Sequence, residues 1–249
     1  WGTLAESVGT GRDLSTPAKT AKPAAITDIG DVDIISAPHT PTGIDELDRV
    51  LCGGLTHGQV ILLAGEPGIG KSTLLASLAL RVHPTLYVAG EESPSQLKLR
   101  FERLGTLPSD LKLITATEAE PIAAAIRSHK PALVIVDSIQ TITTQTYDAV
   151  AGAPTHLRAA TAQLAAAAKE TGVPVILVGQ VTKDGAIAGP KMLEHMVDTV
   201  LSLEGDTRQA HRILRSTKHR FGSTDEVGVF EMTSMGMKGV ASPSALFVG

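Results

Sequence analysis

A glycine-rich octapeptide, GEPGIGKS at positions 65–72, has the composition and spacing of a phosphate-binding loop. Its glycines let the backbone approach phosphate oxygens closely, so that backbone N–H groups can point at them. Lys71 would bridge the β- and γ-phosphates of a bound nucleotide, and the Ser72 hydroxyl would ligate Mg²⁺. A chance lysine in a glycine-rich turn is the alternative, but the apolar ILLA before the loop and the helical STLLASLAL after it favour the phosphate loop. The residues predicted to hold the nucleotide here are Gly65, Glu66, Pro67, Gly68, Ile69, Gly70, Lys71, Ser72 and Thr73.

Three other apolar segments are followed by polar side chains that suit phosphate chemistry. Asp137 ends the segment LVIVD and would hold Mg²⁺ directly or through water, although an aspartate there could also cap the next segment. Glu91 could orient and polarise the water that attacks a γ-phosphate, with its neighbour Glu92 as the alternative base or a helix cap. Gln180 could sense the γ-phosphate, and a polar residue that simply leaves the sheet is nearly as good an interpretation.

The segment 206–221 carries five fixed positive charges against one acid, Asp206. Within KHRFG at 218–222, Lys218 and Arg220 lie two residues apart, so on a strand both would point to one face. A guanidinium there could reach a neighbouring subunit's nucleotide as an arginine finger, whereas the ordinary alternative is a solvated strand face. The five cations are Arg208, Arg212, Arg215, Lys218 and Arg220.

Two glycine-containing stretches, residues 140–154 and 181–191, follow the strands that carry Asp137 and Gln180. Backbone N–H groups and lysines in such loops can grip a sugar-phosphate chain without reading its sequence. An ordinary surface loop explains the residues equally well. The residues predicted to bind DNA are Arg158, Lys183 and Lys191.

Alternating strand-like and helix-like segments must position these residues. Apolar runs typical of strands buried between helices occur at 60–64, 85–89, 111–115, 132–136 and 173–178. Helical patterns lie between them at 71–82, 94–104, 118–129 and 155–170. This alternation predicts an α/β fold with a mostly parallel central sheet and helices on both faces. Three extended segments, at 197–203, 212–217 and 227–233, predict antiparallel strands added at one edge.

Composition narrows the class of protein. The 249 residues carry a net charge of −4 and are 43% hydrophobic, which is typical of a folded protein. A single cysteine, Cys52, excludes an internal disulfide framework or a cysteine-rich zinc site in this chain, and it fits a reducing, cytoplasmic compartment. No stretch approaches the ~18 apolar residues of a membrane span, so we expect no membrane partner. Aromatic residues are only 3%, which argues against base stacking as the way to hold DNA.

Together the motifs resemble the bacterial RadA (also called Sms) DNA repair family of RecA/DnaB-like ATPases. The similarity runs from about residue 42 to residue 239. It includes TGIDELDRVL at 42–51, GEPGIGKSTLL at 65–75, GEES at 90–93, LKLRFERLG at 97–105, VDSIQT at 136–141 and GPKMLEHMVDTVLSLEGD at 189–206. The family motif Lys-Asn-Arg-Phe-Gly corresponds to KHRFG at 218–222. Two positions depart from the family pattern: His219 replaces its asparagine, and Gln180 replaces its usual histidine.

The resemblance implies a RecA-like P-loop ATPase that hydrolyses ATP with Mg²⁺ between the subunits of a homo-hexameric ring. Such a ring would move on single-stranded or branched DNA and promote branch migration in recombinational repair. The catalytic residues would be Lys71, Glu91, Gln180, Lys218 and Arg220, the last two acting on the neighbour's ATP. A phosphotransferase resembling the circadian-clock protein KaiC, and an ATP-gated DNA scaffold with little turnover, remain as alternatives.

The resemblance also divides the chain. Residues 1–25 are expected to be a flexible linker, residues 26–240 the ATPase domain, and residues 241–249 the start of a linker to a further domain. Members of the family carry an N-terminal four-cysteine zinc finger and a C-terminal Lon-protease-like domain. We therefore interpret the chain as the excised ATPase core and expect zinc only in the missing finger.

Overall fold

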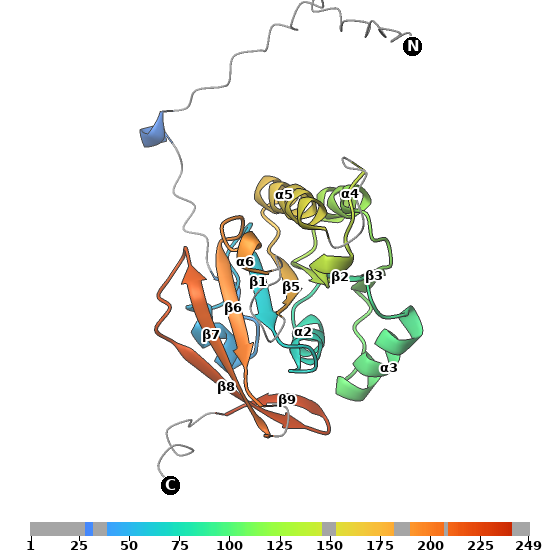
Figure 1. Cartoon of the computed structure of the whole chain (residues 1–249), viewed down its shortest axis with the longest axis vertical. Helices are drawn as coiled ribbons and strands as arrows, with labels where there is room; N and C mark the ends of the chain where they lie inside the picture. Colours follow the sequence, from blue (N-terminus) through green and yellow to red (C-terminus); the bar gives the residue numbers. More distant parts are fainter. Residues whose placement is uncertain (1–27, 32–38, 146–152, 182–189, 207–208, 241–249) are drawn as a thin grey trace, which may run out of the picture. The chain divides into compact units, whose positions relative to one another are not determined.

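The computed structural model of the chain describes residues 28–31, 39–145, 153–181, 190–206 and 209–240. The chain divides into two compact units, Trp1–Ser36 and Ala37–Gly249. In the first unit the structure describes residues 28–31, where Ile29–Asp31 forms a 3-10 turn. The second unit holds all the other described helices and strands (Figure 1).

The described residues of this unit form a nine-stranded sheet with the order β3-β2-β4-β5-β1-β6-β7-β8-β9. The strands from β3 to β6 in this order run parallel, and β7, β8 and β9 continue the sheet antiparallel beyond β6. The predicted α/β fold, with a mostly parallel sheet and antiparallel edge strands, is therefore confirmed. The bounds are β1 Val60–Gly65, β2 Thr85–Ala89, β3 Leu111–Ile114, β4 Leu133–Asp137, β5 Val175–Gln180, β6 Thr199–Glu204, β7 His211–His219, β8 Val227–Thr233 and β9 Gly236–Gly239.

Helices cover both faces of the sheet because its central strands are apolar on both sides. In β1, Ile61 and Leu63 join one hydrophobic core, which includes residues of α1, α2 and α3, whereas Val60 and Leu62 join a second core with residues of α4, α5 and α6. Successive side chains of a strand point to opposite faces, so a continuous apolar run serves both cores. The helices are α1 Asp45–Val50, α2 Lys71–Ala79, α3 Pro94–Leu104, α4 Ala119–His129, α5 Pro154–Thr171 and α6 Pro190–Leu193. Among the described helices none has the length and apolarity needed to cross a membrane.

The edge strands differ from the predictions in three ways. The segment 197–203 was expected to be antiparallel, but β6 pairs parallel with β1 and antiparallel only with β7. The chain passes through α6, which packs against α5 and β1, and so enters β6 from the end of the sheet where β1 also begins. The outer strand β3 is partly exposed rather than buried, since it has a neighbour on one side only. The four residues of β9 include two glycines and had no strand pattern to find.

Candidate nucleotide-binding site

The phosphate loop connects the end of β1 to the start of α2 and is shaped by its glycines. Gly68 and Gly70 have φ angles of +78° and +117°, a region that favours glycine. A Cβ atom on Gly70 would lie 2.6 Å from Cε of Met237 in β9, and one on Gly65 would lie 2.7 Å from the carbonyl oxygen of Leu203 in β6. Because α2 begins at Lys71, its first N–H groups have no partner within the helix and form an anion-binding end.

Lys71 is the buried cation of this loop, with only 6% of its surface exposed. Its Nζ donates hydrogen bonds to the carbonyl oxygens of Gly65 at 2.8 Å and Glu66 at 2.9 Å. Burial lowers the pKa of Lys71, and the negative charges of Asp137 and Glu91 oppose that shift. The ammonium group is therefore held against its own loop and within the field of two carboxylates.

Asp137 and Ser72 meet at the carboxyl end of β4. A small cavity of about 20 Å³ is lined by both residues, and also by Glu91 and Tyr87. The Tyr87 hydroxyl donates a hydrogen bond of 2.8 Å to Oδ2 of Asp137, and burial, followed by the charge of Asp137, raises the pKa of Tyr87 well above its usual value. A hydroxyl and a carboxylate facing one small space are hard oxygen donors of the kind that Mg²⁺ prefers. These residues fit the predicted metal.

Glu91 joins the ends of three neighbouring strands. Its Oε1 accepts hydrogen bonds from the Ser138 hydroxyl, just after β4, and from Nε2 of Gln180 at 3.0 Å, at the end of β5. Nε2 of Gln180 also lies 3.3 Å from Oε2 of Glu91. The structure thus brings together two residues, Glu91 and Gln180, that the sequence predicted separately.

Glu92 faces a different partner. Its Oε1 accepts a hydrogen bond of 2.5 Å from Nη2 of Arg100 in α3. The cap of α3 is Ser93, whose side chain accepts from the Gln96 N–H in a capping box, so Glu92 is not the cap. Of the two acidic neighbours, Glu91 is the one bonded to Ser138 and Gln180 beside the phosphate loop.

Lys218 and Arg220 lie at the opposite end of the sheet. Nζ of Lys218 donates to the carbonyl oxygens of Glu194 at 2.6 Å and Val197 at 2.8 Å. Burial lowers the pKa of Lys218, and the charge of Arg220 lowers it further. Arg220 lies just beyond β7, and its Nη1 contacts Oδ1 of Asp198 at 3.2 Å.

Asp198 fixes this end of the sheet to the start of β1. Its Oδ2 accepts hydrogen bonds from the Val60 N–H at 2.9 Å and from Nζ of Lys169 at 2.5 Å. Val60 begins β1 and the phosphate loop follows its last residue, a separation of roughly 16 Å at the usual rise of a strand. Within one copy of the chain, therefore, the structure does not bring Lys218 and Arg220 to the phosphate loop.

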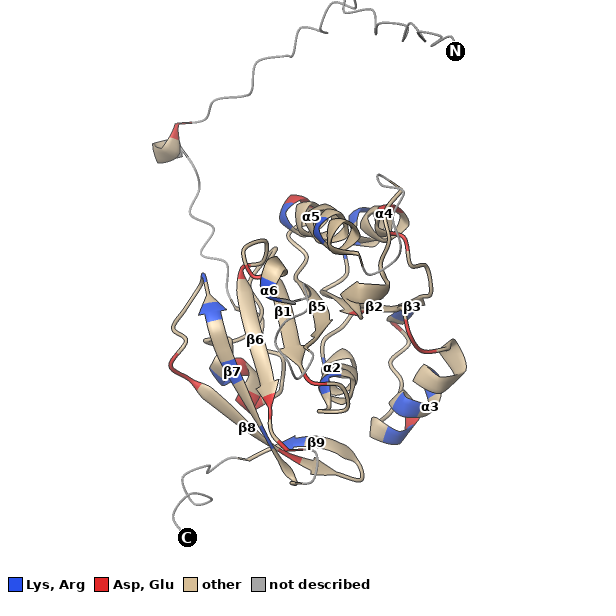
Figure 2. Ribbon diagram, in the orientation of Figure 1, with Lys and Arg blue, Asp and Glu red and all other residues tan. Residues whose placement is uncertain are grey.

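The predicted DNA-binding residues are described in part. Arg158 is exposed on α5 and Lys191 is exposed on α6, whereas Lys183 lies outside the described residues, as does Arg208. Figure 2 shows basic residues on α3, α4, α5 and β7. Of the two predicted loops, residues 146–152 and 182–189 are likewise outside the described part of the chain.

Arg212 is a site residue that the sequence did not single out. It was counted among the cations of a solvated strand face, but only 4% of its surface is exposed. Its Nε donates a hydrogen bond of 2.9 Å to the carbonyl oxygen of Ile69 in the phosphate loop. The signal was present in the alternation of β7, since Arg212 shares its buried face with Leu214 and Ser216.

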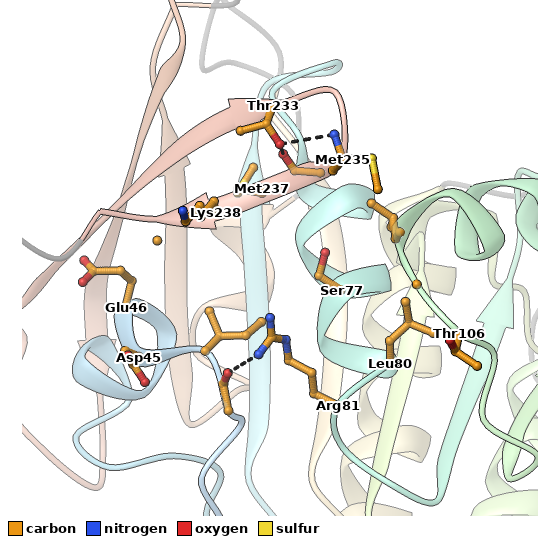
Figure 3. A pocket seen from close by; sticks show the side chains of 16 residues that line it. Asp45, Glu46, Ser77, Leu80, Arg81, Thr106, Thr233, Met235, Met237 and Lys238 are labelled. Atoms are coloured by element: carbon orange, nitrogen blue, oxygen red, sulfur yellow. Dashed lines mark hydrogen bonds between the residues drawn. The ribbon is translucent and has the colours of Figure 1, made fainter.

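A separate cavity of about 670 Å³ lies beside α2 (Figure 3). Its walls include Glu46 of α1, Arg81 after α2, and Met235 and Met237 from the turn and strand that follow β8. Nη1 of Arg81 donates to the Gly43 carbonyl oxygen at 2.6 Å. None of the predicted site residues lines this cavity, so we do not assign it to the candidate nucleotide-binding site despite its size.

Comparison with known proteins agrees with this geometry. A family described as "AAA domain" matches residues 31–186. The chain belongs to the AAA domain family. It is also similar to three proteins named "DNA repair protein RadA": one from Brucella abortus, 45% identical over 100% of this chain and 56% of that protein; one from Mycobacterium tuberculosis, 48% identical over 100% and 53%; and one from Pseudomonas aeruginosa, 46% identical over 100% and 56%.

The chain spans about half the length of the curated relatives it matches. The resemblance to the RadA family that the motifs predicted is confirmed over the whole chain. Membership of the AAA domain family identifies a P-loop ATPase domain and implies the binding and hydrolysis of ATP.

Proposed function

We propose that the chain is the ATP-hydrolysing core of a DNA motor for recombinational repair. The observation that carries this proposal is the contact of Glu91 with Ser138 and Gln180 beside the phosphate loop. It places a carboxylate, and an amide that can respond to the γ-phosphate, at the shared carboxyl edge of β2, β4 and β5.

Binding of the triphosphate falls to the phosphate loop and the start of α2. The N–H groups of the loop and the ammonium group of Lys71 would hold the phosphates. Ser72 and Asp137 would hold Mg²⁺, and the Tyr87 hydroxyl orients the Asp137 carboxylate. When bound, Mg²⁺ supplies positive charge to the β- and γ-phosphate oxygens.

Hydrolysis requires a group that orients water toward the γ-phosphate. Glu91 takes this role and accepts the water's proton at a carboxylate oxygen. Ser138 and Gln180 fix the direction of that carboxylate through their hydrogen bonds. Gln180 would detect the γ-phosphate and transmit its presence into the segment that follows β5.

Lys218 and Arg220 would act on the ATP of a neighbouring copy. Their distance from their own phosphate loop supports a site completed between subunits, and hence a homo-oligomer, which we propose to be a hexameric ring. The exposed Arg158 and Lys191, together with Lys183, would contact the phosphates of single-stranded or branched DNA during branch migration. We place this activity in the cytoplasm, where the chromosome lies.

A subunit-mixing assay tests the proposal. Steady-state ATP hydrolysis would be measured, with and without single-stranded DNA, for the wild type, Lys71→Ala, Arg220→Ala and a mixture of the two variants. We expect each variant alone to be inactive and the mixture to recover turnover, because an intact loop can then meet an intact finger. No recovery would contradict the shared site.

The same assay separates the alternatives. Radiolabelled γ-phosphate that stays on protein would indicate a phosphotransferase. Hydrolysis limited to one turnover, whether or not DNA is present, would indicate a scaffold. Full turnover by Lys71→Ala alone would overturn the assignment of the phosphate loop.

A further inference from the structure

Arg212 connects the antiparallel edge of the sheet to the phosphate loop. Its guanidinium is buried, and its four hydrogen bonds to described residues all run to backbone carbonyl oxygens. Nε donates to Ile69 at 2.9 Å, while Nη1 donates to Asp206 at 3.0 Å, Gln209 at 2.6 Å and His211 at 2.8 Å. One side chain therefore contacts both the phosphate loop and the described residues Asp206, Gln209 and His211.

The fold makes room for this side chain. Gly205, just after β6, has a φ angle of +143°, and a Cβ atom there would lie 3.1 Å from Cδ of Arg212. A buried charge is costly unless it is hydrogen-bonded, and the planar guanidinium, with its five donors, can satisfy several carbonyls at once. Ile69 is held by two kinds of contact: its side chain is buried, and its carbonyl oxygen accepts the hydrogen bond from Arg212.

The bond to Ile69 bears directly on the phosphate cradle. Ile69 precedes Gly70, the cap of α2, so its carbonyl lies outside the hydrogen bonding of that helix. The peptide bond between Ile69 and Gly70 is trans and planar, so the C=O of Ile69 and the N–H of Gly70 point in opposite directions. By holding the carbonyl on its own side, Arg212 turns the Gly70 N–H away from the guanidinium.

We propose that Arg212 is a positioning residue for nucleotide binding, which presets the Gly70 N–H to receive a phosphate oxygen of ATP or ADP. The proposal rests on the proposed ATP site. Arg212 touches neither nucleotide nor reacting atoms, so its removal would lower affinity for the phosphates far more than the rate of the bound complex.

The test compares Arg212→Met and Arg212→Lys with Arg215→Met as the matched control. Arg215 lies on the same strand, is exposed and pairs only loosely with Glu204, at 3.7 Å. For each protein we would measure the Kd of ADP with Mg²⁺, the KM and kcat for ATP, and the Tm without nucleotide. AMP, which lacks the β-phosphate, serves as the second ligand.

We expect Arg212→Met to weaken ADP binding about tenfold or more and to raise KM similarly, with kcat at saturation changed less than about threefold. AMP binding should change little. Arg212→Lys, which keeps the charge but has one donor nitrogen in place of three, should lie between the wild type and Arg212→Met. Arg215→Met should match the wild type. If Arg212 were purely structural, Arg212→Met would lower Tm, but it would not weaken ADP binding more than AMP binding or change KM more than kcat.

Several outcomes would overturn the inference. A folded Arg212→Met that binds ADP as the wild type does, or that loses kcat alone, would refute it. If Arg212→Met does not fold, Arg212→Lys decides: a several-fold rise in the Kd of ADP supports the inference, and a wild-type Kd refutes it. If the wild type itself binds neither ADP nor ATP, the proposed function fails, and the inference with it.

Discussion

Charged side chains lie near both ends of β1, but they have different partners at the two ends. At its carboxyl end, Lys71 opens α2, Glu91 follows β2 and Gln180 ends β5, and Glu91 is bonded to Gln180. At its amino end, Lys218 is held by two backbone carbonyls and Arg220 by the buried carboxylate of Asp198. We propose a nucleotide for the first end, whereas the second end is built around the buried carboxylate of Asp198.

Asp198 and Glu91 illustrate this difference, since the first supports the fold and the second is proposed to act in hydrolysis. Asp198 is almost fully buried and receives hydrogen bonds from the backbone, from Lys169 and from Arg220, so it contributes to the fold itself. Glu91, by contrast, binds two side chains that are themselves site residues. We therefore expect mutation of Glu91 to reduce turnover with little loss of stability, and mutation of Asp198 to lower stability first.

The largest effect is expected for Glu91→Gln. An amide cannot accept the proton of the attacking water, so kcat should fall about 100-fold or more while ATP affinity stays within a few-fold of the wild type. Glu92→Gln is the matched control, since it removes the same charge one residue away, at a carboxylate that is paired with Arg100 and not with Ser138 or Gln180. Steady-state kinetics and ATP titration measure both. A greater loss in Glu92→Gln would assign the base to Glu92 instead.

A smaller effect, on stability, is expected for Asp198→Asn. The amide has one oxygen, which can still accept from the Val60 N–H and from Nζ of Lys169. Its NH₂ group then faces the guanidinium of Arg220, which is already a donor, so that contact and the buried negative charge are lost. Breaking a buried charged network of this kind costs about 3 kcal/mol. Urea unfolding measures the loss, with Lys169→Met as the comparison, because that half-exposed lysine should cost less than about 1 kcal/mol. Equal stability of Asp198→Asn and wild type would show that the amino end of β1 is not held by this carboxylate.

The two ends also differed in how far the sequence predicted them. The phosphate loop and Asp137 follow from short local patterns, because a glycine loop between strand and helix needs no distant partner to be identified. The contact between Glu91 and Gln180 could have been predicted once both were placed at strand ends, because the carboxyl ends of parallel strands lie at the same edge of the sheet. Asp198 was not singled out, because its partners Val60 and Lys169 are far away in the sequence.

The direction of β6 shows the same limit. Its own residues, TVLSLE, suit either direction of pairing, and the path of the chain through α6 decides between them. Arg212 was misjudged for a related reason, since counting charges along residues 206–221 ignored which face of β7 each cation occupies. Composition identifies a basic segment, but only alternation along a strand separates its buried member from its exposed ones.

The smallest expected effect is a pH dependence of stability at the amino end, through His219. Burial lowers the pKa of His219 below 6.5, and its Nδ1 accepts a hydrogen bond from the Phe221 N–H at 3.1 Å, which requires the neutral ring. As pH falls through about 6.5, the unfolded chain takes up a proton before the folded chain does, so the free energy of unfolding decreases. The decrease ends once the pH is below the folded pKa. His219→Asn keeps an acceptor but cannot titrate, so its free energy of unfolding should fall less between pH 7.5 and pH 5. Parallel urea titrations of the two proteins measure the difference, and identical pH profiles would contradict a neutral, partly buried His219.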